Sequence, residues 1–446
     1  MPKERNPELE KEQAILREMP PVKFKELQDI TNTWMMQADP HALKVMAATV
    51  IANRLPGDPI WIFLIGPSSG GKTMMLSMLN KLEEIYPLSN LTPNTFVSGQ
   101  RNVPGLLFEI NGKILTFKDF TTILQLYQEA RNEIMSQLRE IYDGSYRKLY
   151  GTGEERAWTG KIGFIAGVTS VIDVTSQLYS ALGERFIQYR LITPDRSEVA
   201  LYAVNSSSRK KVTQDEAKKQ VQEYFARYIK GVKESIDPDE EMTTSDEQRR
   251  QLVRITDFAT LARSPVMRDS GPAREVYFKP TSEMPARFTQ QLHHIMMAMM
   301  FMNRYEKSIA GVKPKETDSD ITEDDELAIY KIALDSIPMM RRIVLQKVTE
   351  YDSATTAVIA ALTNYPTNTT RRNLEDLNVL GIIDRIKDEA NKADRWKIKD
   401  KYRKIMEEYD HVVPVPDSER ELKEKEIMDI VALFEKENPD VQFEQG

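Results

Sequence analysis

The stretch that decides the fold reads Gly66-Pro67-Ser68-Ser69-Gly70-Gly71-Lys72-Thr73. It matches the pattern G-x-x-x-x-G-K-[ST] at every fixed position. The continuous apolar segment 60–65 leads into it and predicts a strand buried on both faces. The apolar residues that follow, 74–79, predict a helix. Strand, glycine-rich loop and helix in this order form a cradle for an anion, because main-chain N–H groups and the helix N-terminus point at one place.

The cradle predicts a site for ATP or GTP, with all eight residues from Gly66 to Thr73 as nucleotide contacts. Lys72 is expected to reach the β- and γ-phosphates, and the Thr73 hydroxyl is expected to coordinate Mg²⁺. The alternative is a chance match to the pattern. The strand before the loop and the helix after it argue against chance, because they supply the structural context that the pattern requires.

Composition limits the remaining possibilities. The chain has 446 residues, of which 41% are hydrophobic, so we expect two or three domains with hydrophobic cores. It contains no cysteine, which excludes disulfides and thiolate metal sites and is compatible with a reducing cytoplasm. No apolar run is long enough to cross a bilayer, and the charged residues 1–12 do not resemble a signal peptide, so we expect a cytoplasmic protein without membrane contact.

Apolar strands alternate with amphipathic helices between residues 60 and 193. This pattern predicts an α/β fold in which a parallel sheet is covered by helices on both faces. The strands are expected at residues 60–65, 113–117, 162–169 and 186–191, with a further candidate at 95–97.

The chain divides into six segments. They are a charged N-terminal segment (1–22), the α/β core (23–200), a helical region (201–312), a charged linker (313–325), a C-terminal domain (326–408) and an acidic amphipathic tail (409–446). The tail has an apolar helical stripe, so it is a candidate for docking on this chain or on a protein partner.

A second hydrophobic strand ends at Lys118-Asp119. An acid in this place can hold Mg²⁺ or its water beside the phosphate loop. The usual ending has two acids, Asp-Glu, and here one of them is missing. Asp119 is therefore expected to serve the metal, the attacking water or both. The alternative is a strand that ends in an ordinary surface aspartate.

Three segments follow in order: a helix at 133–143, a strand at 158–169, and the box Gly183-Glu184-Arg185-Phe186. This order resembles the core of an AAA+ ATPase, which implies ATP as the nucleotide and a helical lid in 201–312. The box is similar to the Ser-Arg-Phe arginine-finger box of MCM helicases. In overall texture the chain is most similar to the AAA+ ATPases of bacteriophages and other mobile elements.

The resemblance implies roles for single residues. Thr169 matches sensor 1, which orients the attacking water, and Arg287 matches sensor 2 in the lid. Arg185 matches the arginine finger, which contacts the γ-phosphate bound by a neighbouring subunit. The alternative for Arg185 is an ion pair within its own subunit, and Arg190 and Arg196 are weaker candidates for the finger. A finger acting across subunits implies head-to-tail assembly into a ring, by default a hexamer, or a filament.

The C-terminal domain resembles a winged helix. Helices are expected at 337–351, 355–362 and 370–380, and a hairpin, the wing, at 382–386 and 395–399. In such modules the third helix enters the major groove and the wing touches the DNA backbone. Residues 367–404 hold 11 Lys and Arg against 7 Asp and Glu, in a chain whose net charge is −7. The candidate DNA contacts are Arg371, Arg372, Arg385, Lys387, Lys397 and Lys399.

The alternative is a winged helix that contacts protein, and Glu375 and Asp376 in the third helix count against tight DNA binding.

The leading functional hypothesis is an AAA+ DNA motor, a replication helicase or helicase-like initiator of a phage or mobile element. A second is an AAA+ transcription activator, although residues 97–105 do not match the Gly-Ala-Phe-Thr-Gly-Ala loop of that class. A third is a nucleotide-gated scaffold for transposition or defence, with slow ATP hydrolysis and no unwinding.

Overall fold

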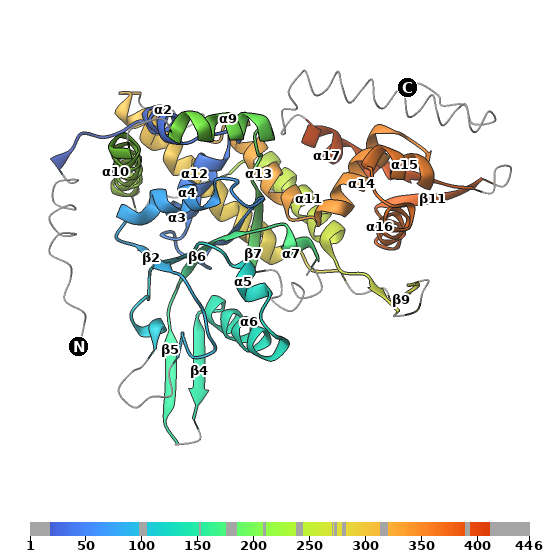
Figure 1. Ribbon diagram of the computed structural model, residues 1–446, viewed down its shortest axis with the longest axis horizontal. Coiled ribbons are helices and arrows are strands. Elements are labelled where there is room, and N and C mark those ends of the chain that lie inside the picture. Colours follow the sequence, from blue (N-terminus) through green and yellow to red (C-terminus); the bar gives the residue numbers. More distant parts are fainter. Residues whose placement is uncertain are drawn as a thin grey trace. The chain divides into compact units, whose positions relative to one another are not determined.

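The structure is a computed structural model, and Figure 1 shows its course. It describes residues 18–97, 105–150, 153–174, 185–207, 211–237, 244–269, 271, 274–278, 282–312, 320–388 and 393–410. Gly183 and Glu184 of the expected finger box, residues 98–104 and the expected helix of the tail lie outside this set. The chain forms two compact units, one of residues 1–249 and 289–332 and the other of residues 250–288 and 333–446.

The first unit is built on a five-stranded parallel sheet, which confirms the expected α/β fold. Its strand order is β2-β3-β6-β1-β7. The strands are β1 (Trp61–Ile65), β2 (Ile85–Leu88), β3 (Ile114–Phe117), β6 (Gly163–Val168) and β7 (Phe186–Arg190). Every residue of β1, β3 and β6 is buried, as their largely apolar sequences predict; the one polar residue among them is Thr116.

Two strand predictions are wrong. Residues 95–97 form a turn, and the edge strand next to β3 is β2 instead. Half-exposed residues and Pro87 hid β2 from the sequence pattern, and proline is tolerated there because an edge strand has a side without a ladder partner. The strand expected at 158–169 is also two elements, since Glu155–Thr159 forms β5 and pairs with β4 (Ser145–Leu149) in a separate antiparallel hairpin.

Helices cover both faces of the sheet (Figure 1). On one face, α6 (Gln128–Tyr142) and the short α5 (Thr121–Leu124) close over an aromatic core in which the rings of Phe63 and Phe186 stack at 3.9 Å. The other helices that include residues of this unit are α2 (Phe24–Trp34), α3 (Ala42–Ala52), α4 (Lys72–Met78), α7 (Val171–Val174), α9 (Arg196–Ser207), α10 (Lys211–Ser235), α11 (Asp246–Arg263), α12 (Ala286–Ile309) and α13 (Glu323–Asp335). None of the described helices is both long enough and apolar enough to cross a bilayer.

The second unit contains the helices and hairpin expected near the C-terminus. They are α14 (Met339–Glu350), α15 (Thr356–Thr363), α16 (Thr367–Val379), β11 (Ile383–Asp388) and β12 (Ala393–Ile398), followed by α17 (Asp400–Asp410). Strand β10 (Ala354–Thr355) joins the hairpin in a three-stranded antiparallel sheet, and Trp396 of β12 is buried. A second, short hairpin pairs β8 (Met267–Arg268) with β9 (Val276–Phe278).

Candidate active site

The glycine-rich loop has the backbone shape that its sequence requires. Gly71 caps α4 with φ 82°, in the left-handed region where glycine carries no steric penalty. A Cβ atom on Gly70 would lie 3.0 Å from the carbonyl oxygen of Pro67, so a side chain there would crowd the loop. Ser69 adopts φ 64°, which is uncommon for a residue with a side chain and occurs at ligand-binding turns. The loop is therefore locally strained.

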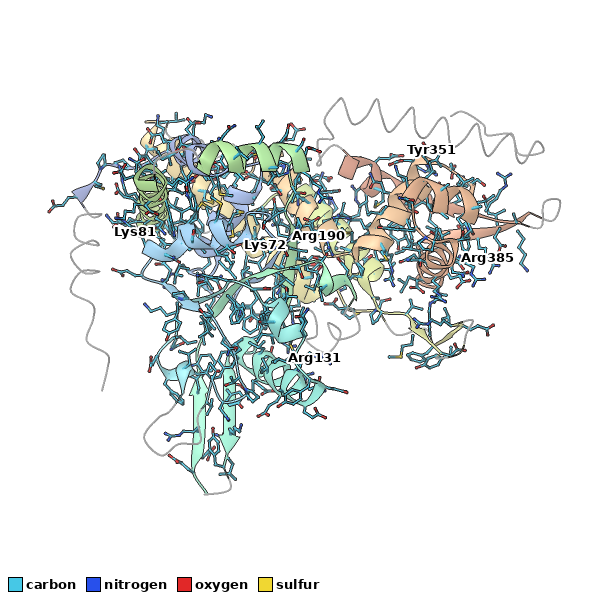
Figure 2. All side chains as sticks on the ribbon, viewed as in Figure 1. Lys72, Lys81, Arg131, Arg190, Tyr351 and Arg385 are labelled. Carbon is cyan, nitrogen blue, oxygen red and sulfur yellow. The ribbon has the colours of Figure 1, made fainter. Side chains whose placement is uncertain are left out.

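Lys72 lies over this loop at the start of α4, where Figure 2 labels it. Its Nζ atom donates hydrogen bonds to the carbonyl oxygens of Gly66 at 2.7 Å and Pro67 at 2.6 Å. The residue is only 8% exposed, and burial lowers the pKa of its ammonium, while the carboxylate of Asp119 acts in the opposite direction. The main-chain carbonyls hold the Lys72 charge in the loop, where an arriving phosphate can replace them.

The topology brings Asp119 and Thr169 to the same edge of the sheet as the loop. Strand β6 lies between β3 and β1, and parallel strands present their carboxyl ends at one edge. Asp119 follows β3, Thr169 follows β6 and the loop follows β1. The N–H of Gly66 donates to the carbonyl of Val168 at 3.2 Å. Three of the residues predicted for ATP chemistry, Lys72, Asp119 and Thr169, therefore meet at this edge.

The ends of β3 and β6 approach each other unusually closely at Gly167. The N–H of Phe120 donates to the Gly167 carbonyl at 2.8 Å. A Cβ atom at Gly167 would lie 2.5 Å from the carbonyl oxygen of Lys118, closer than two such atoms can approach. Glycine is therefore required here, because any side chain would push the acid-bearing turn away from β6.

Thr121, which the sequence interpretation did not single out, joins Asp119 to Thr169. Its main-chain N–H donates to Asp119 Oδ1 at 3.1 Å. Its hydroxyl oxygen accepts the Thr169 N–H at 3.0 Å and lies 3.2 Å from the Thr169 hydroxyl. No sequence motif marks this residue, because its partner Thr169 is far away along the chain.

A cavity of about 610 Å³ opens beside the loop. This volume lies in the usual range for small-molecule sites, and the lining is largely apolar. Its walls come from residues 35–39 and Ala42, from the loop and the start of α4, and from residues 191–194, Arg196, Val199 and Tyr202. The segment 35–42 precedes the P-loop strand and carries no motif that could have predicted its role.

Asp39 fixes two walls of this cavity to each other. Its carboxylate accepts the Tyr189 hydroxyl at 2.7 Å and the Ile192 N–H at 3.0 Å. The ammonium of Lys331 on α13 lies 3.7 Å from the carboxylate and donates to the Arg190 carbonyl. Asp39 and Lys331 are both buried, so their opposite charges compensate each other in a low-dielectric environment.

Arg185 lies at the opposite end of the sheet from the loop. Phe186 pairs with Trp61 at the start of β1, whereas Arg190 pairs with Ile65 at its end. At about 3.3 Å per residue, Arg185 is about 17 Å from the level of the loop, beyond the reach of its side chain. Its guanidinium donates to both carboxylate oxygens of Asp143, at 3.2 and 2.6 Å. The intrasubunit ion pair that the sequence left open is therefore present.

The other arginines named for this site have different surroundings. Arg190, labelled in Figure 2, is at the loop edge of β7 and forms two hydrogen bonds with Asp173, at 2.8 and 2.7 Å. Arg196 lines the cavity. Arg287 is the second residue of α12 and belongs to the second unit, so its role as sensor 2 stays a prediction.

The oxygen ligands near the loop fit a Mg²⁺ ion that arrives with a nucleotide. Within the described residues, no three His, Cys, Asp or Glu side chains cluster in a way that could hold a metal ion. Magnesium commonly needs only one or two protein oxygens, because phosphates and waters complete its octahedron. Thr73 and Asp119 are both exposed and supply such oxygens.

In the second unit, most of the candidate DNA contacts lie beside carboxylates. Arg371 lies 3.8 Å from Glu375, Lys397 lies 3.4 Å from Asp352, and Lys399 lies 3.6 Å from Asp384. Arg385 forms a close ion pair with Asp394, and Lys387 is exposed on β11. Arg372 lies on α16 with its carbonyl engaged by Arg268.

Arg268 of β8 binds the acidic residues of α16. Its guanidinium donates to Glu375 at 3.0 Å, to Asp376 at 2.6 Å and to the carbonyl of Arg372 at 2.8 Å. The buried Arg341 also donates to Asp376, at 3.2 Å. The two acids that counted against DNA binding are therefore compensated by arginines that the sequence interpretation did not connect with α16.

No protein-family model matches the chain, and no curated protein matches it. One similar solved structure is the crystal structure of NtrX from Brucella abortus in complex with ADP, with 12% sequence identity, coverage of 80% of this chain and 71% of that chain, and a TM-score of 0.28. Similarity at this level does not establish a shared fold.

Proposed function

We propose that the protein is an AAA+ ATPase that hydrolyses ATP with Mg²⁺. The observation that carries the proposal is the meeting of Lys72, Asp119 and Thr169 at one edge of the sheet, beside a cavity of about 610 Å³. A glycine-rich loop alone serves many kinds of nucleotide-binding protein. Thr169, which follows the neighbouring strand β6, and Asp119, which follows β3 on the far side of β6, supply the hydroxyl and the acid that hydrolysis needs.

In the proposed mechanism, Lys72 exchanges its two main-chain carbonyls for the β- and γ-phosphates. Thr73 and Asp119 would hold Mg²⁺, and the bound ion would neutralise charge on the phosphates. Asp119 also polarises the attacking water, and the Thr169 hydroxyl orients that water in line with the γ-phosphate. The base and ribose occupy the cavity between residues 35–39 and 191–194.

The test compares Asp119→Asn and Lys72→Ala with the wild type in phosphate release and in binding of a fluorescent ATP analogue. Asp119→Asn should lower turnover about a hundredfold and keep nucleotide binding, because it removes a charge used in the reaction. Lys72→Ala should weaken binding as well, because it removes a phosphate contact. Asp29→Asn on α2, an exposed aspartate, is the matched control. A wild-type rate for Asp119→Asn would exclude its proposed role.

We further propose that the subunits assemble head to tail, as a hexameric ring or a filament, with Arg185 serving the neighbour's nucleotide. The support is its distance from its own loop, about 17 Å along the sheet. In this assembly Arg185 exchanges Asp143 for the γ-phosphate of the adjacent subunit. A guanidinium there neutralises charge that develops during phosphoryl transfer.

DNA is the proposed partner of the second unit. Elements α14 to α16 and the β11–β12 hairpin follow one another in the order of a winged helix, and residues 367–404 are basic in an acidic chain. We propose a replication helicase or helicase-like initiator of a phage or mobile element. Strand displacement on a forked DNA, measured with ATP and with the Lys72→Ala variant, tests this role.

A nucleotide-gated scaffold or regulator is the second candidate. Lys118 stands in the place of the first acid of the usual Asp-Glu pair, which favours slow hydrolysis, and the ion pairs of the basic side chains reduce their attraction for DNA. DNA-stimulated ATP hydrolysis without strand displacement would favour this candidate over the motor.

A further inference from the structure

Thr121 is the first residue of α5 and stands two positions after Asp119. It is 6% exposed, so its polar groups are withdrawn from water. A buried hydroxyl or N–H that loses its partner is left without the hydrogen bond that water would supply, so the hydrogen bonds of Thr121 are strongly favoured. Each of them leads to a residue of the proposed active site.

The main-chain N–H of Thr121 binds the Asp119 side chain. It donates to Asp119 Oδ1 at 3.1 Å, which closes a turn and limits the rotation of the carboxylate. The neighbouring Thr122 makes a different contact, since its hydroxyl donates to the main-chain carbonyl of Asp119 at 2.9 Å. The orientation of the Asp119 carboxylate therefore depends on the position of the Thr121 main chain.

The side-chain hydroxyl of Thr121 holds the other end. Its oxygen accepts the Thr169 N–H at 3.0 Å and pairs with the Thr169 hydroxyl at 3.2 Å. When Thr121 donates in that pair, the proton of the Thr169 hydroxyl is left to point toward another acceptor. One residue thus holds Thr169 through both its main-chain N–H and its hydroxyl.

We propose that Thr121 is a positioning residue for ATP hydrolysis, which holds Asp119 and Thr169 at a fixed separation. This inference rests on the proposed function. It adds the residue that aligns the Asp119 carboxylate with the Thr169 hydroxyl. The strand end has only one acid, so the alignment of Asp119 with the water-orienting hydroxyl matters more than it would with two. A displacement of about 1 Å between reacting groups can cost a hundredfold in rate.

The test is steady-state ATP hydrolysis by the full chain with Thr121→Val and Thr121→Ser. Valine keeps the shape and removes the hydroxyl, so kcat should fall about tenfold to a hundredfold while the affinity for a fluorescent ATP analogue stays within about twofold. Serine keeps the hydroxyl, so it should restore kcat to within about threefold of the wild type. Thr159→Val, the same change at an exposed threonine of β5, should leave kcat within about twofold of the wild type.

Two further variants separate positioning from stability. If Thr121→Val does not fold, Thr121→Ala removes the same hydroxyl and is measured in its place. The double variant Thr121→Val, Thr169→Val should lose less than the product of the two single losses, because the two hydroxyls interact with each other. Equal kcat for Thr121→Val and the wild type, or a fall that serine does not reverse, would overturn the positioning role. A wild type without ATP hydrolysis would instead overturn the proposed function.

Discussion

The site beside the glycine-rich loop and the basic surface of the second unit both hold basic side chains that already have partners, but the partners differ. At the loop, Lys72 is satisfied by main-chain carbonyls, which a phosphate can replace. On the second unit, Arg385 and Lys397 lie beside the carboxylates of Asp394 and Asp352. A ligand of the first site displaces neutral groups, whereas DNA on the second surface has to compete with formal negative charges.

The difference concerns what a sequence pattern can predict. The fixed spacing of residues 66–73 specifies the backbone conformation of the loop. That conformation in turn determines where Lys72 lies. A count of basic residues specifies no geometry. Most of the named cations in residues 367–404 have an acid within 4 Å, so the local net charge overstates the attraction that a phosphate would feel.

The largest expected effect is the loss of ATP hydrolysis when Arg185 is removed. This prediction tests whether an arginine that forms an ion pair within its own subunit also acts on a nucleotide. Arg185→Ala should lower ATP hydrolysis about a thousandfold if the guanidinium serves a neighbouring subunit. Asp143→Asn removes the ion pair and keeps the arginine, so it should retain most of the activity. Phosphate release and the melting temperature, Tm, are measured for both variants.

A mixture provides the second measurement for Arg185. Arg185→Ala and Lys72→Ala proteins are each expected to be inactive, but in exchanging mixtures some interfaces would pair an intact loop with an intact finger. Activity should therefore recover in part. If both the Arg185 and Asp143 variants lose stability alike and keep full hydrolysis, then Arg185 is only a structural ion-pair partner.

Much of the nucleotide site could be predicted because its signals are local. The loop, the strand before it and Asp119 lie in short segments whose residue types reveal their structure. Thr121, Asp39 and Arg268 could not be found in the same way. Each acts through a partner at least 48 positions away, and only the folded chain brings such pairs together.

The fold shows the same division between local and distant information. Buried parallel strands are continuous apolar runs, so β1 and β3 were predictable. Edge strand β2 is half exposed, and the β4–β5 hairpin alternates buried and exposed residues over only five positions in each strand. Such short elements have weak patterns of their own and take their structure from pairing.

Charge reversal on the second unit should have an intermediate effect. Changing Arg371, Arg372, Lys397 and Lys399 to Glu should weaken DNA binding about a hundredfold at low salt, because four phosphate contacts become repulsions. The loss should shrink as salt rises. Fluorescence anisotropy with a labelled duplex at two salt concentrations measures both quantities.

The control for this variant makes the same change in net charge at four other positions of the chain. Reversal of the exposed Lys25, Arg147, Lys219 and Arg249, which lie outside residues 367–404, to Glu alters the total charge by the same amount. It should weaken DNA binding much less if the contact is local. Equal losses in the two variants would show that only the total charge matters, and unchanged affinity in the first would favour a protein partner for α16.

Arg268 gives the smallest expected effect and separates two uses of the α16 face. Arg268→Met keeps the apolar stem and removes the charge that binds Glu375 and Asp376. If α16 faces DNA, the two carboxylates become less compensated and affinity should fall about threefold at low salt, with recovery when Glu375→Gln is added. Arg268→Lys retains the charge without the bidentate geometry, so the loss of DNA affinity should be smaller than for Arg268→Met. The melting temperature of each variant is measured beside the anisotropy titration, because Arg341 still binds Asp376 and should keep the helix in place. A rise in affinity for Arg268→Met would mean that the β8–β9 hairpin covers the binding face, and that the ion pairs close this surface to DNA.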